Sequence, residues 1–131
     1  TGVQLEVGQN PTEFEHEPFA VTLDKCERYY MRTGINGGNG AIASGYVHTS
    51  SEVRYSLRMR KEMRSAPSLA FVNTGDFLLQ DRADNRTPSS FAAYSGKDFT
   101  LIVAGHSGGN VGEGSNLLSG GSSEIQCYSE L

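Results

Sequence analysis

A serine between glycines stands directly after an apolar stretch, an arrangement that hydrolases use to present a nucleophile. Gly105-His-Ser-Gly-Gly109 matches the G-x-S-x-G pattern and follows Thr100-Leu-Ile-Val-Ala104. In an α/β-hydrolase this serine lies on a strained turn between a strand and a helix. The residues after Gly109 are rich in glycine and form helices poorly. We therefore expect a flexible hairpin loop and no enzyme, with a small serine hydrolase using Ser107 as the remote alternative.

The residues that bind metals or phosphates do not form a local site. The three histidines are isolated in the sequence, at His16, His48 and His106, and no Cys-x-x-Cys pair is present. The glycine-rich stretch 34–40 lacks the lysine of a phosphate loop and predicts a wide turn. We therefore expect no metal and no cofactor.

The two cysteines, Cys26 and Cys127, lie near opposite ends of the chain. A small secreted disulfide scaffold uses more cysteines than this. Two buried thiols are the first interpretation, and a disulfide between the first and last strands stays open as the second.

A polar loop at 80–87 offers groups that suit a sugar. Its arginines, aspartates and asparagine could donate and accept hydrogen bonds in pairs, as sugar hydroxyls require. Tyr94 follows it and offers a ring on which a sugar could stack; the chain has no Trp. The candidate glycan-binding residues are therefore Arg82, Asp84, Asn85, Arg86 and Tyr94. An ordinary connection between two strands is the alternative.

Basic residues gather in one part of this acidic chain. They are Arg54, Arg58, Arg60, Lys61 and Arg64. On a strand, the first three would project from one face as a positive strip that could meet an anionic glycan or a neighbouring subunit. A solvated outer face that prevents edge-to-edge aggregation is the alternative interpretation.

The elements that must position these groups are short strands separated by turns. The stretch 53–59 alternates cleanly, with Val53, Tyr55, Leu57 and Met59 on one face. Further strands are predicted at 3–7, 42–48, 68–73, 77–80, 90–94, 99–104 and 124–128. Only 20–27 is typical of a helical turn or two, with Thr22 as its cap. The sequence therefore predicts an all-β protein, an antiparallel, jelly-roll-like β-sandwich with one short helix near the N-terminus.

The same alternation predicts which side chains are buried. The expected core residues are Leu23, Tyr29, Leu57, Leu69, Phe71, Leu101 and Val103.

Length and charge limit the classes of partner. The 131 residues are enough for one domain, and the net charge of −4 argues against nucleic-acid binding. No run of about 18 apolar residues is present, so we expect no membrane insertion.

Three sequence segments, in this order, resemble a known protein family. They are Thr1-Gly-Val-Gln-Leu-Glu-Val-Gly8, then Pro11-Thr-Glu-Phe-Glu-His16, then Leu23-Asp-Lys-Cys-Glu-Arg-Tyr-Tyr30, and the chain closes on Ser129-Glu-Leu131. Together they resemble the beginning and end of the C-terminal domain of bacteriophage tail and tail-fibre proteins. The resemblance covers the first quarter and the last residues only. It implies that 1–19 are a strand and linker from a preceding domain and that 20–131 form a single C-terminal β-domain. A start in mid-strand at Thr1 fits a piece of a longer polypeptide.

The resemblance also implies a function. It implies a non-enzymatic virion domain of the phage tail, assembled in the bacterial cytoplasm, homotrimeric and joined to an upstream domain of the same polypeptide. Such a domain would attach the particle to a host cell-surface polysaccharide. A purely structural trimerisation, capping or capsid-decoration domain is the alternative.

Overall fold

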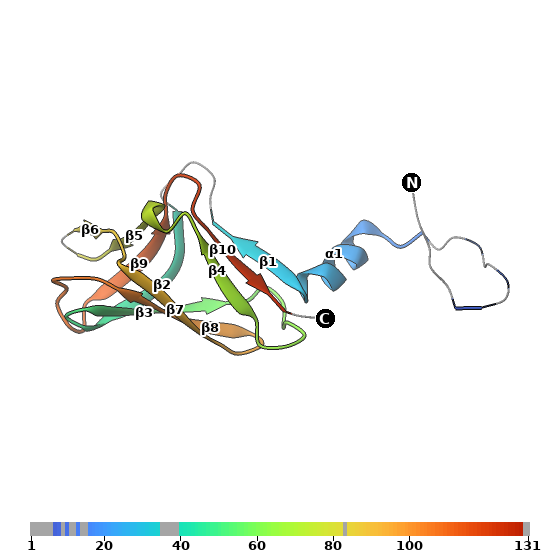
Figure 1. Ribbon diagram of the computed structural model, residues 1–131, viewed down its shortest axis with the longest axis horizontal. Coiled ribbons are helices and arrows are strands. Elements are labelled where there is room, and N and C mark those ends of the chain that lie inside the picture. Colours follow the sequence, from blue (N-terminus) through green and yellow to red (C-terminus); the bar gives the residue numbers. More distant parts are fainter. Residues whose placement is uncertain are drawn as a thin grey trace.

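The protein is a β-domain with one helix at its N-terminal side (Figure 1). The structure is a computed structural model and describes residues 7–8, 10, 13, 16–34, 40–82 and 84–129. Helix α1 spans Phe19–Glu27, and a short 3-10 helix, η1, spans Thr74–Asp76. The strands are β1 (Tyr30–Thr33), β2 (Gly40–Thr49), β3 (Glu52–Arg58), β4 (Ser68–Val72), β5 (Phe77–Gln80), β6 (Asn85–Arg86), β7 (Ser90–Ser95), β8 (Phe99–Gly105), β9 (Gly114–Ser119) and β10 (Glu124–Tyr128).

The strands form two antiparallel sheets, in which strands from the beginning of the chain pair with strands from its end. The smaller sheet has the order β1-β10-β4 and the larger has the order β6-β5-β9-β2-β3-β8-β7. The first strand pairs with the last, β2 with β9, β3 with β8 and β5 with β6, while β4 lies next to β7. This is the connectivity of a long hairpin rolled into a jelly roll. The predicted all-β sandwich with one short helix is confirmed.

Strand β3 carries one side of the core, as its alternation predicts. Val53, Tyr55 and Leu57 are buried, and Met59 continues their face just beyond the strand. Ser56 and Arg58, on the other face, are exposed. The polar and apolar faces of β3 are therefore set by the period of two in its sequence.

The buried residues of strand β8 are the neighbours of those that were predicted to be buried. Ile102 and Ala104 are fully buried, whereas Leu101 and Val103 lie half-buried on the outer face. Ile102 pairs with the buried Tyr55 of β3, and this register fixes which face of β8 points inward. The expectation that Leu101 and Val103 form the core was wrong, because a run of apolar residues carries no alternation from which to read the phase.

The helix also differs from the expected one. Leu23 was expected in the core but is 45% exposed, and α1 has no buried residue. Thr22 does not cap the helix; it lies inside it and donates a hydrogen bond to Glu17. Tyr29, just after the helix, is half-buried beneath the Arg64 guanidinium, 5.7 Å from its ring centre. The helix is therefore attached beside the sandwich rather than packed into it (Figure 1).

Two predicted core residues of β4 are half-buried against the core. These are Leu69 and Phe71, and the Phe71 ring stacks on Phe91 of β7 with centroids 4.3 Å apart. Phe77 meets both rings edge-on. This aromatic group closes the sandwich where β4 and β7 lie next to each other.

The cysteines are both free thiols. Cys26 on α1 is exposed, so its expected burial was wrong, while Cys127 on β10 is fully buried. Burial raises the pKa of the Cys127 thiol to about 11. The disulfide left open by the sequence is not formed.

Three strands, β1, β6 and β9, were not predicted, and the strand predicted at 3–7 lies almost wholly outside the described residues. Across the described ranges, none of the helical segments has the length and apolar content needed to cross a bilayer.

Candidate functional site

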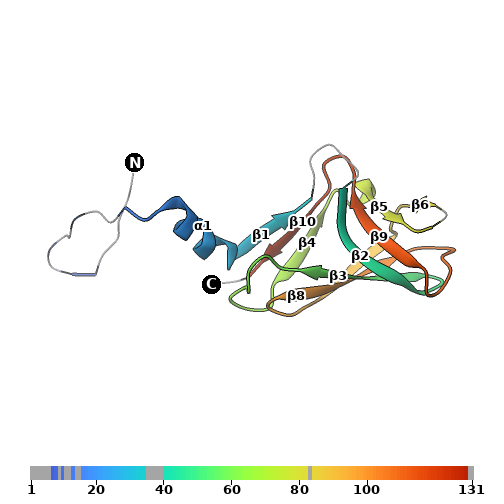
Figure 2. The ribbon, with the colours of Figure 1, turned by 180° about the vertical axis from the view of Figure 1, so that it is seen from behind.

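One end of the molecule is built from loops and lies opposite the helix. The β5–β6 hairpin, the β2–β3 turn and the loop between β8 and β9 gather there, while α1 and the C-terminal end of the chain lie at the other end (Figures 1 and 2). The strands hold the ends of these loops, so the surface they form is positioned by the sandwich. We call this end, formed by 81–82, 84, 50–51 and 106–113, the distal end.

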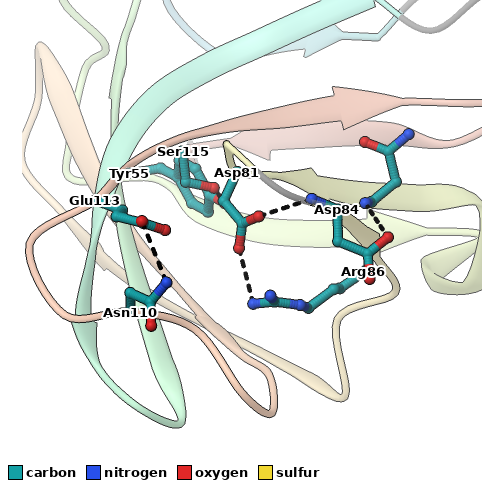
Figure 3. Close-up of polar contacts among 8 residues, drawn as sticks. Tyr55, Asp81, Asp84, Arg86, Asn110, Glu113 and Ser115 are labelled. Carbon is teal, nitrogen blue, oxygen red and sulfur yellow. Dashed lines mark hydrogen bonds and ion pairs between the residues drawn. The ribbon is translucent and has the colours of Figure 1, made fainter.

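The β5–β6 hairpin is closed by an aspartate at its base. A carboxylate oxygen of Asp81 lies 2.8 Å from Nη1 of Arg86, and the other accepts a hydrogen bond of 3.0 Å from the Asp84 amide (Figure 3). The Asp84 carboxylate in turn accepts the Asn85 amide at 2.8 Å. Aspartates that bond the backbone a few residues on are a common way to fix a turn. These contacts join the described residues on the two sides of the hairpin.

A buried hydrogen bond lies close enough to Asp81 for its charge to act on Tyr55. The Tyr55 hydroxyl on β3 and the Ser115 hydroxyl on β9 are 2.7 Å apart, and both residues are buried (Figure 3). Burial raises the pKa of Tyr55 to about 12, and the negative charge of Asp81 adds to the rise. The phenol therefore stays protonated and neutral at physiological pH.

Above this base the hairpin forms an open polar hollow of about 310 Å³. Its lining consists of Gln80, Asp81, Arg82, Asp84 and Asn85. The Asp81 side chain is only 5% exposed, while Arg82, Asp84 and Asn85 are exposed. The hollow thus presents amide, guanidinium and carboxylate groups to solvent above a fixed floor.

The structure brings together four of the five candidate residues and separates the fifth. Arg82, Asp84 and Asn85 share the hollow, and Arg86 holds its base through Asp81. Tyr94 lies on β7, at the opposite edge of the seven-stranded sheet from β6. It is also four residues along β7 from Ser90, or about 13 Å farther from the loop. Tyr94 does not line the hollow.

A row of polar side chains extends from the hollow across the outer face of the seven-stranded sheet. Asn85 pairs with Gln80, Gln80 with Asn116 and Asn116 with Ser44, so the four share one face. The Ser44 hydroxyl donates to the Asn116 side chain at 2.8 Å. Tyr46 lies two residues further along β2, is 47% exposed, and meets His48 edge-on at 6.0 Å.

Sequence reasoning missed this row for an identifiable reason. Asn116 belongs to β9, a strand rich in glycine and serine that was taken for part of a loop region. The signal available was the short alternation 115–118, in which the buried Ser115 and Leu117 flank Asn116. Tyr46 lies inside a predicted strand, and its outward direction follows from the buried Val47 beside it.

The loop between β8 and β9 holds Ser107, and it joins two strands rather than a strand and a helix. Ser107 is exposed, while the neighbouring His106 is buried with neither ring nitrogen hydrogen-bonded to another described group. A Cβ on Gly109 would lie 2.4 Å from the His106 ring, so glycine is needed to let the loop pass over it. In this geometry His106 does not serve Ser107 as a base.

The basic cluster is divided among several acidic partners. Nε of Arg54 lies 2.7 Å from Glu52, which raises the pKa of the Arg54 guanidinium. Arg60 pairs with Glu27 of α1 at 3.9 Å. Lys61 forms an ion pair with Asp24 of α1, and Arg64 covers Tyr29. These contacts reduce the unpaired positive charge of this basic cluster. Two of them, Arg60–Glu27 and Lys61–Asp24, attach helix α1 to the β-domain.

No group of three or more His, Cys, Asp or Glu residues is placed to hold a metal ion within the ranges that the structure describes. Comparisons with protein-family models, with curated proteins and with solved structures found no match to this chain.

Proposed function

We propose that this chain is the receptor-recognition domain at the end of a bacteriophage tail fibre or related tail protein, and that its distal end binds a host surface glycan. The observation that carries the proposal is the polar hollow lined by residues of the β5–β6 hairpin. This hairpin lies at the end of the molecule opposite α1 (Figure 1). A domain joined to an upstream domain through its helical end would present this hollow outward, away from the virion. The resemblance of residues 1–30 to phage tail and fibre proteins supports the same arrangement.

The chemistry of the hollow favours an uncharged, hydroxyl-rich ligand. Asp81 and Arg86 neutralise each other at its base, and Arg82 and Asp84 contribute one charge of each sign above it. Gln80 and Asn85 add planar amides that donate and accept at once. Pairs of sugar hydroxyls match such groups, whereas a strongly anionic polymer would need an excess of positive charge.

The polar row gives the ligand a direction. A polysaccharide longer than one residue can continue from Asn85 and Gln80 over Asn116 and Ser44 toward Tyr46. The exposed Tyr46 ring supplies the apolar face on which a sugar ring stacks. We therefore propose an extended polysaccharide rather than a single monosaccharide as the ligand. The fold alone would not assign this function, since jelly rolls serve both virion and lectin roles.

Binding to bacterial cells tests the proposal. The labelled chain is incubated with a panel of bacterial strains, with their purified surface polysaccharides, and with the same cells after periodate has cleaved vicinal diols. We expect saturable binding to at least one strain, binding of its polysaccharide, and loss of both after periodate. Binding that survives periodate would point to a protein receptor and contradict a glycan ligand.

A purely structural role as a trimerisation or capping domain is the second candidate, and the exposed apolar helix favours it. It predicts no adsorption to any strain, together with a stable oligomer. In either role we propose that the domain is part of a homotrimeric fibre and resides in the virion.

A further inference from the structure

A buried histidine lies beneath the β8–β9 loop, residues 106–113. His106 is 7% exposed, and among the described residues neither Nδ1 nor Nε2 of its ring has a hydrogen-bond partner. A neutral imidazole has one N–H donor and one acceptor nitrogen, and burial removes both from water. Burying a polar group without a replacement partner is unfavourable. The buried position of the ring therefore depends on the packing around it.

The backbone of the same loop covers the ring. A Cβ on Gly109 would lie 2.4 Å from Cε1 and 3.2 Å from Nε2 of His106, and 3.1 Å from Cγ1 of Val47. The Gly109 backbone thus lies against the ring, beside Val47 of β2. Glycine allows this approach, because a side chain at 109 would displace the ring. The contact between Gly109 and His106 therefore closes the loop over the ring.

Hydrogen bonds hold the two ends of this loop. At its start, the His106 amide donates to the Ser51 carbonyl at 3.0 Å. At its end, the Gly112 amide donates to the Val47 carbonyl and the Val47 amide donates to the Glu113 carbonyl, each at 2.9 Å. Both ends are therefore joined to the hairpin formed by β2 and β3.

The middle of the loop has no such attachment. Within residues 107–111, the one backbone hydrogen bond to a described residue is local, from the Glu113 amide to the Asn110 carbonyl at 3.2 Å. Gly108 and Gly112 have φ values of +79° and +88°, in the left-handed region that glycine adopts readily. Rotation at these two glycines would move the segment between them while the loop ends stay attached.

The titratable groups on the elements around the ring are engaged elsewhere. They are His48 on β2, Glu52 at the start of β3 and Glu113 in the loop. Their partners are Tyr46 at 6.0 Å between ring centroids, Arg54 at 2.7 Å and Asn110 at 3.2 Å, the last drawn in Figure 3. Among the described residues, none is hydrogen-bonded to the His106 ring. A proton on the ring would therefore have no acceptor in the closed loop.

We propose that the β8–β9 loop is an acid-sensitive lid, which opens when the His106 ring takes up a proton. Histidine is the side chain whose charge ordinarily changes between about pH 5 and 8. In the closed loop the second N–H and the positive charge would both be buried without partners, whereas in the open loop water solvates them. The proton therefore binds the open state better, and a fall in pH shifts the population toward that state. The lid does not depend on the proposed glycan role.

NMR spectroscopy of the wild-type chain tests the lid. At about pH 8 we expect a nuclear Overhauser effect between Hε1 of His106 and Hα of Gly109, because the ring lies against the Gly109 backbone. At about pH 5, with the ring protonated, we expect this signal to be lost and the heteronuclear NOE of residues 107–111 to fall to that of a flexible loop. The amide signals of β3 and β8 should remain those of a folded sandwich.

A first pair of variants separates His106 from other groups that titrate. His106→Phe keeps a ring beneath the loop but removes the ionisable nitrogen atoms, so the loop should stay closed at both pH values. His48→Gln is the control, because His48 is a half-buried histidine on the neighbouring β2. This control should keep the pH dependence of the wild type.

A second pair of variants tests the closing contact without a change of pH. Gly109→Ala places a Cβ against the ring, so the loop should already be open at about pH 8. Gly114→Ala is its control, because a Cβ at Gly114 would meet no atom within 4 Å. The loop of the control should stay closed.

A contact between Gly109 and His106 that persists at about pH 5 would overturn the lid, whether or not the ring has titrated. Acid opening of the His106→Phe loop, or a closed loop in Gly109→Ala, would overturn it as well. The wild-type measurement requires no variant to fold. None of these readouts uses a glycan, so a loop that stays closed would reject the lid alone, and a chain that fails to adsorb would reject recognition alone.

Discussion

Asp81 and Arg86 face each other across the β5–β6 hairpin, with a carboxylate oxygen and Nη1 2.8 Å apart and the aspartate almost fully buried (Figure 3). The pair joins the first residue after β5 to the last residue of β6. It thereby fixes the hairpin that carries Arg82, Asp84 and Asn85. The recognition surface proposed for this protein depends on that contact.

Removing the charge of Asp81 should loosen the hairpin. In Asp81→Asn the amide oxygen can still accept the Asp84 amide, but the partly buried Arg86 loses its counter-charge. We expect the free energy of unfolding in urea to fall by about 1–3 kcal/mol. Glu52→Gln is the control, because it breaks the more exposed pair with Arg54 and should cost less than about 1 kcal/mol. Equal losses in the two variants would show that Asp81 has no special structural role.

Alanine substitutions at two neighbouring residues test which face of β8 points into the core. Ile102→Ala empties a fully buried position and should cost about 2–5 kcal/mol of unfolding free energy. Leu101→Ala, on the half-buried outer face, should cost clearly less, under about 2 kcal/mol. The reverse order would place Leu101 in the core and contradict the register with β3.

The burial of the Tyr55 hydroxyl, which raises its pKa, should make the protein sensitive to alkaline pH. The pKa of Tyr55 rises from 10.0 to about 12 on folding, so its contribution to stability is complete below pH 10 and is lost as the pH rises toward 12. Tyr55→Phe removes this contribution. We expect the variant to be less stable at pH 7 by about 1 kcal/mol, because Ser115 loses its partner, and to lose less further stability between pH 10 and 12. Parallel curves for the two proteins in urea titrations at these pH values would contradict the raised pKa.

The contrast between β3 and β8 shows what the sequence could predict. Polar residues alternate with Val53, Tyr55 and Leu57, so the inward face of β3 follows from its own sequence. Ile102 has apolar neighbours on both sides, and only pairing with β3 selects it for the core. Strand pairing is a long-range property that a single segment does not encode.

For the candidate site, the local polar loop could be predicted from the sequence, whereas residues brought to it by strand pairing could not. The aspartates and asparagine predicted a polar connection at 80–87 because their bonds to the backbone are local, but the short strand β6 within it was not predicted. Tyr94 was placed beside it through closeness in sequence, but the order of strands puts it at the other edge of the sheet. Asn116 and Ser44 join the hollow through pairings across β9, a strand too rich in glycine and serine to be recognised.

Adsorption to host cells by a variant of the hollow tests the central claim most directly. The double change Arg82→Ala and Asn85→Ala removes two exposed groups and leaves the Asp81–Arg86 pair in place. Tyr94→Ala is the control, exposed on the same sheet at the opposite edge. We predict that the double variant loses at least tenfold in affinity for a bound strain, about 1.4 kcal/mol, with unchanged stability and oligomeric mass, while Tyr94→Ala binds like the wild type. Wild-type adsorption by the double variant would contradict recognition at this hollow.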